Sequence, residues 1–137
     1  MNDTKNTAGP ARDAGWDVGV RKTVPAPVAE VWTYLLGPGL PMWLGEIPEL
    51  PTKKGVRYRT ADGVRGTIRG YAQQKNVRLT WQPEDWPHET TLQLTVTKAG
   101  EGTTIHIQHE DLADREERRM MVGHWHRVAD SLVARFS

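Results

Sequence analysis

The chain has 137 residues, a length that suits one domain of ordinary size and is short for two. Its formal net charge is +1 with acids and bases interspersed, which argues against a nucleic-acid-binding surface. Cysteine is absent, so disulfides, thiolate catalysis and cysteine-ligated zinc are excluded, and a reducing, cytoplasmic location is expected. No run approaches the roughly 18 apolar residues of a membrane span, so we expect none.

The N-terminal part of the sequence divides into a polar segment and the start of a folded domain. Residues 1–15 carry few apolar side chains and are predicted to form a flexible tail, whereas residues 16–137 are predicted to form a single domain. Valines alternate with polar residues over 18–24 and predict a first strand. Prolines end that strand, and helical spacing of apolar residues predicts short helices over 28–35 and 40–44.

The middle of the chain alternates between apolar and polar residues after a loop at 45–55. Further strands are predicted around residues 56–58, 64–71, 77–81, 92–96 and 105–109. The connections between them are short, so we expect antiparallel pairing. Gly66 and Gly70 predict bends or bulges, and the two prolines of residues 83–89 predict a wide connection.

The C-terminal segment changes to a helical period. Asp114 is the expected N-cap, and acidic residues occupy the first turn. One apolar face follows at helical spacing, formed by Met121, Trp125, Val128, Leu132 and Phe136. Since this helix alone is large enough to cover the apolar face of the sheet, we predict an α+β fold. In that fold a curved antiparallel sheet of about six strands wraps around the C-terminal helix, and two short helices follow the first strand.

Four stretches of the sequence together resemble a known family: VPAPVAEVWTYL, GTIRGYAQQKNVRLTW, GEGTTIHIQHEDL and VGHWHRVADSLV. In order and spacing they resemble the activator of heat-shock protein 90 ATPase-like family. This family lies within the START-related (SRPBCC) helix-grip superfamily, which includes birch-pollen allergen and polyketide cyclases. The resemblance covers residues 18–136 and implies the helix-grip, START-like fold. His124 departs from the pattern, because the family usually has glycine immediately before the helix tryptophan.

Large side chains on the predicted inward faces are the candidate ligand-binding residues. The sequence has six tryptophans against one phenylalanine, and indoles suit pocket walls because each joins a large apolar area to one N–H donor. We expect an apolar cavity between the sheet and the C-terminal helix, although simple core packing is the alternative role for each residue. The candidates are Trp32, Trp43, Tyr58, Leu79, Trp81, Leu94, Ile107, His109, Met121, His124, Trp125 and Val128.

The histidines divide into two that face inward and others that face solvent. His109 and His124 are expected to meet inside, as an acid–base or ligand-orienting pair or as structural hydrogen-bonding groups. His88 and His106 are expected to face solvent. His124 and His126 point apart on a helix, so no metal site is predicted. No nucleotide-binding glycine motif is present, and we expect no cofactor.

Five arginines lie on neighbouring predicted strands, at positions 57, 59, 65, 69 and 78. If they share the outer face of the sheet, they form a basic stripe that suits a protein or anion contact, and solvation is the alternative.

Three functions are compatible with these patterns. The leading hypothesis is a binding module for a small hydrophobic or aromatic ligand, held between the sheet and the C-terminal helix. The alternatives are a cofactor-free cyclase- or hydrolase-like enzyme that uses the same pocket, with unknown catalytic residues, and a chaperone cofactor or stress-response interaction protein. The expected partners are therefore the ligand and a chaperone or other protein, and the chain is expected to be a monomer or a homodimer.

Overall fold

The computed structural model describes residues 16–137, and the predicted tail at residues 1–15 lies outside the described residues. The elements follow in the order β2 (Trp16–Val24), α1 (Val28–Leu35), α2 (Leu40–Trp43), β3 (Arg57–Arg59), β4 (Arg65–Ala72), β5 (Asn76–Trp81), β6 (Thr90–Ala99), β7 (Gly102–Leu112) and α3 (Arg115–Phe136). This order confirms the predicted α+β helix-grip fold.

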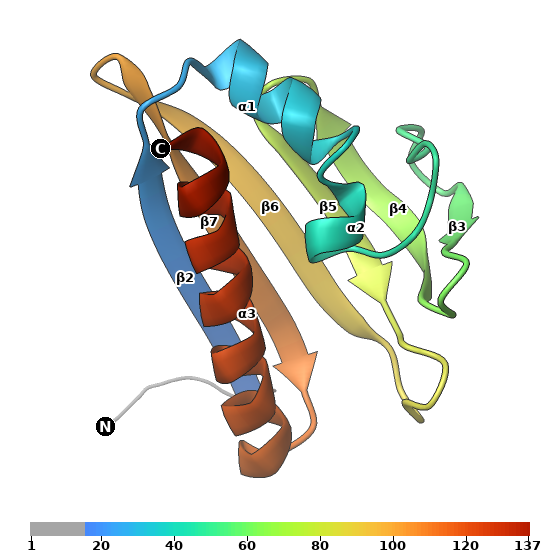
Figure 1. Ribbon diagram of the computed structural model, residues 1–137. Helices are drawn as coiled ribbons and strands as arrows, with labels where there is room; N and C mark the ends of the chain where they lie inside the picture. Colours follow the sequence, from blue (N-terminus) through green and yellow to red (C-terminus); the bar gives the residue numbers. More distant parts are fainter. Residues whose placement is uncertain (1–15) are drawn as a thin grey trace, which may run out of the picture.

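One six-stranded antiparallel sheet carries the fold, in the order β2-β7-β6-β5-β4-β3. From β3 to β7 the strands are neighbours in the sequence, as their short connections predict, and β2 joins the far edge beside β7. Figure 1 shows the sheet curving around α3, with α1 and α2 over the same face, and α1 contacts β6 and β7. The core therefore lies between one face of the sheet and three helices.

Helix α3 begins at the predicted N-cap and is 22 residues long. The Glu117 backbone N–H donates to Asp114 Oδ1 at 2.9 Å, and the Ala113 N–H donates to the Glu117 carboxylate at 2.8 Å. Both bonds satisfy donors at a helix start that have no partner within the helix. The predicted apolar face of α3 is buried against the sheet. Within residues 16–137, no helix is both long and apolar enough to cross a membrane.

Strand β4 is bent where its glycines predicted a bend. Its register against β5 shifts between Ile68 and Gly70, which confirms the expected bulge. At Gly66 the neighbouring strand comes so close that an added Cβ would lie 1.9 Å from the carbonyl oxygen of Thr80. The curvature of this end of the sheet therefore depends on a position that has no side chain.

Candidate functional site

The largest group of aromatic side chains in the core forms an aromatic cluster of Trp81, Trp86, His109 and Trp125. Trp81 comes from β5, Trp86 from the β5–β6 loop, His109 from β7 and Trp125 from α3. Ring centroids lie 4.9 Å apart for Trp81 and His109, 5.3 Å for Trp81 and Trp86, and 5.7 Å for His109 and Trp125, all close to edge-to-face. Strand alternation directs Trp81 and His109 inward, helical spacing does the same for Trp125, and the β5–β6 loop brings Trp86 against them.

A chain of hydrogen bonds fixes the imidazole of His109. The indole N–H of Trp125 donates to His109 Nδ1 at 3.0 Å, so this nitrogen carries no proton. The proton is on Nε2, which lies 2.8 Å from Thr90 Oγ1, and the Thr90 hydroxyl donates to the Trp81 carbonyl at 2.7 Å. Every donor in this chain has an acceptor, which assigns the tautomer.

Burial keeps the imidazole of His109 neutral. The side chain is fully buried, and burial, with smaller effects of His124 and His88, lowers its pKa to about 3. Both ring nitrogens are occupied, so neither is free to exchange a proton with a bound molecule. The geometry therefore supports the structural role that the sequence left open for His109.

His124 lies at the margin of the aromatic cluster. Its half-buried ring is 4.5 Å from that of Trp125, centroid to centroid, and burial followed by the charge of Arg127 lowers its pKa. Because Trp125 and Thr90 occupy both nitrogens of His109, the two histidines form no hydrogen-bonded pair. The imidazole that replaces the usual family glycine thus packs against the indole that follows it.

The indole N–H of Trp81 has no hydrogen-bond partner. Among buried side-chain polar atoms of residues 16–137, Trp81 Nε1 is the one left unsatisfied, and only 6% of the residue is exposed. The indole of Trp43 donates to the Leu35 carbonyl at 2.8 Å, and that of Trp32 to the Tyr71 hydroxyl at 3.4 Å. A buried donor without an acceptor costs free energy, so this atom marks a place that an acceptor would stabilise.

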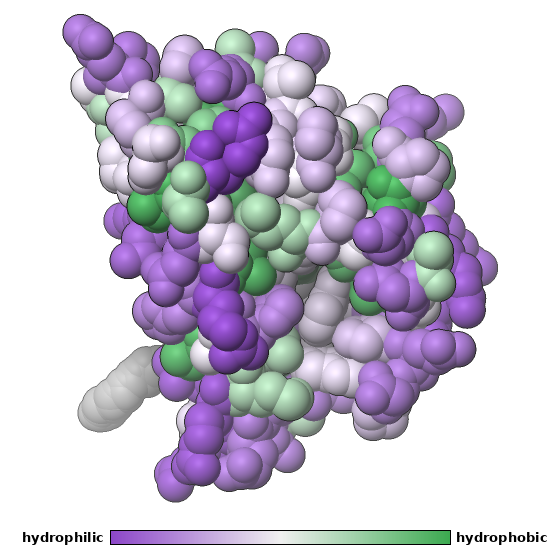
Figure 2. Space-filling view, in the orientation of Figure 1, coloured by the Kyte–Doolittle hydropathy of each residue, from purple (hydrophilic) through white to green (hydrophobic). Residues whose placement is uncertain are grey.

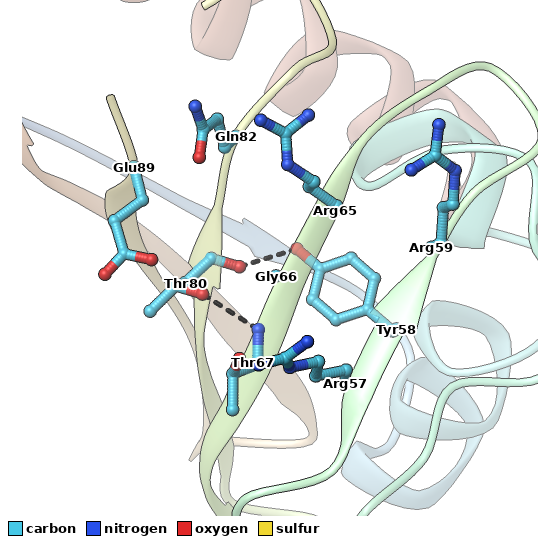
Figure 3. A pocket seen from close by; sticks show the side chains of 9 residues that line it. All are labelled: Arg57, Tyr58, Arg59, Arg65, Gly66, Thr67, Thr80, Gln82 and Glu89. Atoms are coloured by element: carbon cyan, nitrogen blue, oxygen red, sulfur yellow. Dashed lines mark hydrogen bonds between the residues drawn. The ribbon is translucent and has the colours of Figure 1, made fainter. Parts of the chain in front are cut away.

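The remaining candidates lie mostly in the core. Buried positions are confirmed for Trp32, Trp43, Leu79, Leu94, Ile107, Met121 and Val128. Tyr58 is buried as well, but it lines a different hollow together with arginines of β3 and β4 (Figure 3). Figure 2 shows the surface hollowed between α3 and the segment that carries α2, with pale colours of intermediate hydropathy lining the hollow. No group of three or more potential metal ligands occurs within residues 16–137.

Sequence reasoning did not select three residues of this region, which are Trp86, Thr90 and Glu117. Trp86 lies in the proline-bounded connection, where periodicity gives no direction, and only its residue type could have drawn attention. The expectation that His88 faces solvent holds only in part, because its side chain is partly buried and its Nε2 lies 2.9 Å from the carboxylate of Glu117. This contact ties the loop that carries Trp86 to the start of α3.

Replacement of His88 by glutamine is expected to reduce stability at low pH more than at high pH. Hydrogen bonding to Glu117, the largest effect, raises the pKa of His88 above its usual 6.5. Its stabilising contribution is therefore complete below 6.5 and lost as the pH rises through the raised value. For a partly exposed pair of this kind, we expect His88→Gln to lower the free energy of unfolding by about 0.5–1 kcal/mol near pH 5.5 and by much less near pH 9, measured by urea unfolding.

The comparison of His88→Gln with the parent protein at each pH isolates this pair. The buried His109 acts in the opposite direction, since its lowered pKa makes the folded state lose stability as the pH falls below 6.5. That effect is common to both proteins and cancels in the difference. Glu117→Gln keeps an acceptor for the Ala113 N–H and should give the same loss. An identical difference at both pH values would contradict the assignment.

Comparisons with solved structures found the same fold in several organisms. CalU16 from Micromonospora echinospora is 18% identical with a TM-score of 0.72, and the match covers 88% of this chain and 74% of that one. The Aha1 dimer from Colwellia psychrerythraea is 16% identical with a TM-score of 0.69, and the match covers 88% of this chain and 96% of that one. An HSP90 activator from Plasmodium falciparum is 13% identical with a TM-score of 0.62, and the match covers 74% of this chain and 76% of that one. At these identities the likeness shows the shared fold.

A comparison with curated proteins found no match. The comparison with protein families found one whose sequence pattern matches residues 25–137, and its description is Activator of Hsp90 ATPase homolog 1-like protein. The matched region contains all the helices and every strand except β2. Because the match covers most of the chain, this protein belongs to the Activator of Hsp90 ATPase homolog 1-like family.

Proposed function

We propose that the protein binds a small, mainly aromatic ligand with a hydrogen-bond acceptor, held between the sheet and α3 at the aromatic cluster. The observation that carries this proposal is the unsatisfied N–H of Trp81, a buried donor on a ring that packs against those of Trp86 and His109. An acceptor on the ligand would satisfy that donor, and the aromatic rings of the ligand would pack against the side chains of the cluster.

The surroundings of Trp81 support the same reading. The β5–β6 loop brings Trp86 against Trp81, and Trp86 is only partly buried, so one wall of the cluster is in contact with solvent. The surface hollow beside α3 supports an approach from outside (Figure 2). The fixed hydrogen-bond chain through His109 would hold the opposite wall rigid, and rigid walls reduce the entropy lost on binding.

Titration with quinoline and with naphthalene would test the proposal. The two molecules have the same shape, but only quinoline carries a ring nitrogen that accepts a hydrogen bond. With quinoline we expect the indole N–H resonance of Trp81 to move saturably in a proton–nitrogen NMR spectrum. The indole of Trp43, which already donates to the Leu35 carbonyl, should stay in place as an internal control.

Trp81→Phe separates the hydrogen bond from the packing. The variant keeps a large aromatic ring and removes a donor that has no partner, so it is expected to fold. The variant should bind quinoline roughly three- to ten-fold more weakly than the parent protein, which is the value of one ordinary hydrogen bond. Its affinity for naphthalene should stay within about two-fold of that of the parent. Unchanged indole resonances with both compounds, in a protein shown to be folded, would contradict the proposal.

In that case the chaperone cofactor becomes the leading function. The family description names an activator of the Hsp90 ATPase, and a similar structure from Plasmodium falciparum is described as an HSP90 activator. The similar protein from Colwellia psychrerythraea is described as a dimer, which keeps a homodimer among the proposals for this chain. The enzymatic alternative finds less support, because the nitrogens of His109 are already occupied.

A further inference from the structure

A second hollow, which we call the arginine hollow, lies on the outer face of the sheet. It has a volume of about 480 Å³ and is lined by Arg57, Tyr58, Arg59, Arg65, Gly66, Thr67, Thr80, Gln82 and Glu89 (Figure 3). In β4 and β5 its threonines alternate with Ile68, Leu79 and Trp81, which are buried in the core. Alternate residues of a strand point to opposite faces, so the arginine hollow opens away from the helices and from the aromatic cluster.

Two of its arginines stand directly opposite each other. Arg59 of β3 pairs with Arg65 of β4 in the register of the sheet. The flanking residues Thr60 and Val64 are joined by a backbone hydrogen bond, so Arg59 and Arg65 form a non-hydrogen-bonded pair, the type whose side chains approach most closely. Like charges directly opposite in a sheet destabilise it. An anion bound between them would convert this repulsion into attraction.

The charges of the arginine hollow have no ion-pair partner within the described part of the chain. Among residues 16–137, no hydrogen bond or ion pair joins the guanidinium groups of Arg57, Arg59 or Arg65 to another side chain. Arg78 differs from them, since it binds Glu110 and Gln93, each at 2.8 Å. Three arginines against the single carboxylate of Glu89 leave an excess of two positive charges in the hollow, while the whole chain carries only +1.

The floor of the arginine hollow is held by hydrogen bonds. The Tyr58 hydroxyl donates to the Thr80 carbonyl at 2.6 Å, and the Thr67 N–H donates to Thr80 Oγ1 at 2.8 Å. Arg65 and Gln82 exchange two backbone hydrogen bonds of 3.0 and 2.9 Å. The strands that carry the arginines are therefore fixed before any ligand binds, which limits the ordering that binding requires.

We propose that the arginine hollow binds the phosphate group of a small phosphate monoester. A phosphate monoester carries about 1.5 to 2 negative charges at neutral pH, which matches the local excess, and guanidinium groups bind phosphate through paired N–H donors. These three arginines line a single hollow, which favours a compact dianion over an extended polyanion. The hollow exceeds the size of phosphate alone, and Glu89 at its margin suits hydroxyl groups on the organic part.

Titration with glucose 6-phosphate at constant ionic strength would test this inference. We expect saturable shifts of the backbone amide resonances of Gly66 and Thr67, and at least a ten-fold weaker affinity for Arg59→Gln and for Arg65→Gln. Arg69→Gln is the matched control, because it removes the same charge from an exposed position of β4 that does not line the hollow. The affinity of Arg69→Gln for glucose 6-phosphate should stay within about two-fold of that of the parent protein.

Thermal unfolding adds a readout that a general charge effect would not produce. In phosphate-free buffer, Arg59→Gln should raise the unfolding midpoint because it removes the repulsion with Arg65, and it should lose the further rise that glucose 6-phosphate gives the parent protein. Non-saturable shifts, or equal weakening by Arg59→Gln and Arg69→Gln, would overturn the inference. Inorganic phosphate binding as tightly as glucose 6-phosphate would also overturn it, since the organic part would then make no contact.

Discussion

Trp125→Ala is expected to lower the free energy of unfolding by about 3–5 kcal/mol, measured by urea unfolding. Trp125 is the largest fully buried side chain, and its ring packs against those of His109 and His124 between α3 and the sheet. Alanine would leave a cavity where the helix meets β7, and it would also leave His109 Nδ1 buried without its donor. Both effects act in the same direction.

Trp125→Phe separates these two contributions. Phenylalanine fills most of the space but supplies no N–H, so the expected loss is about 1–3 kcal/mol, the cost of an unsatisfied buried acceptor with a small change in packing. Thr90→Val removes the other partner of His109, and the double variant should deviate from additivity by about 0.5–3 kcal/mol. Thr91→Val lies on the outer face of the same strand, and its change in the free energy of unfolding should simply add to that of Trp125→Phe. Additivity in both pairs would show that the hydrogen-bond chain does not act as a unit.

Gly66→Ala is expected to lower the free energy of unfolding by about 3 kcal/mol or more. The added Cβ would lie 1.9 Å from the Thr80 carbonyl oxygen and 2.8 Å from the ring of Tyr58. The first of these atoms is backbone, so it can move only if β4 and β5 separate. That separation would also break the hydrogen bond from the Tyr58 hydroxyl to the Thr80 carbonyl. Urea unfolding would measure the loss.

Gly70→Ala provides the matched control for this prediction. Gly70 lies on the same strand, where an added Cβ meets no atom within 4 Å. The substitution there should change stability by less than about 1 kcal/mol, and the reduced freedom of the unfolded chain favours a small gain. If the two variants unfold at the same urea concentration, β4 and β5 do not approach each other as closely as described.

Most of the fold follows from local patterns in the sequence. Alternation over 92–96 and 105–109 predicted two strands correctly because one face of the sheet is buried and the other is not. Asp114 was identifiable as the N-cap because the cap and its partner lie within four residues of each other. Such features depend on neighbours in the sequence, and burial of one face makes them unambiguous.

The details of the candidate site depend on contacts between distant segments. His88 and Glu117 are 29 residues apart, and no periodicity relates a loop to the end of a helix. Alternation predicted Tyr58 in the interior wall, whereas the absent side chain of Gly66 lets the phenol reach across β4 to the Thr80 carbonyl. In the same way, the acceptor that Trp125 finds in His109 is set by the angle of α3 against β7. These relations are properties of the packed molecule.

The pairing of β2 with β7 has a consequence for synthesis on the ribosome. β2 is the first described strand to emerge, yet its sheet partner, residues 102–112, and the helix that packs over it are made after all the other described elements. Until then its apolar residues, among them Val18, Val20 and Val24, have no place to be buried. Completion of the sheet must therefore wait until residues 102–112 have been translated, and the nascent strand stays exposed to other unfolded chains throughout that interval.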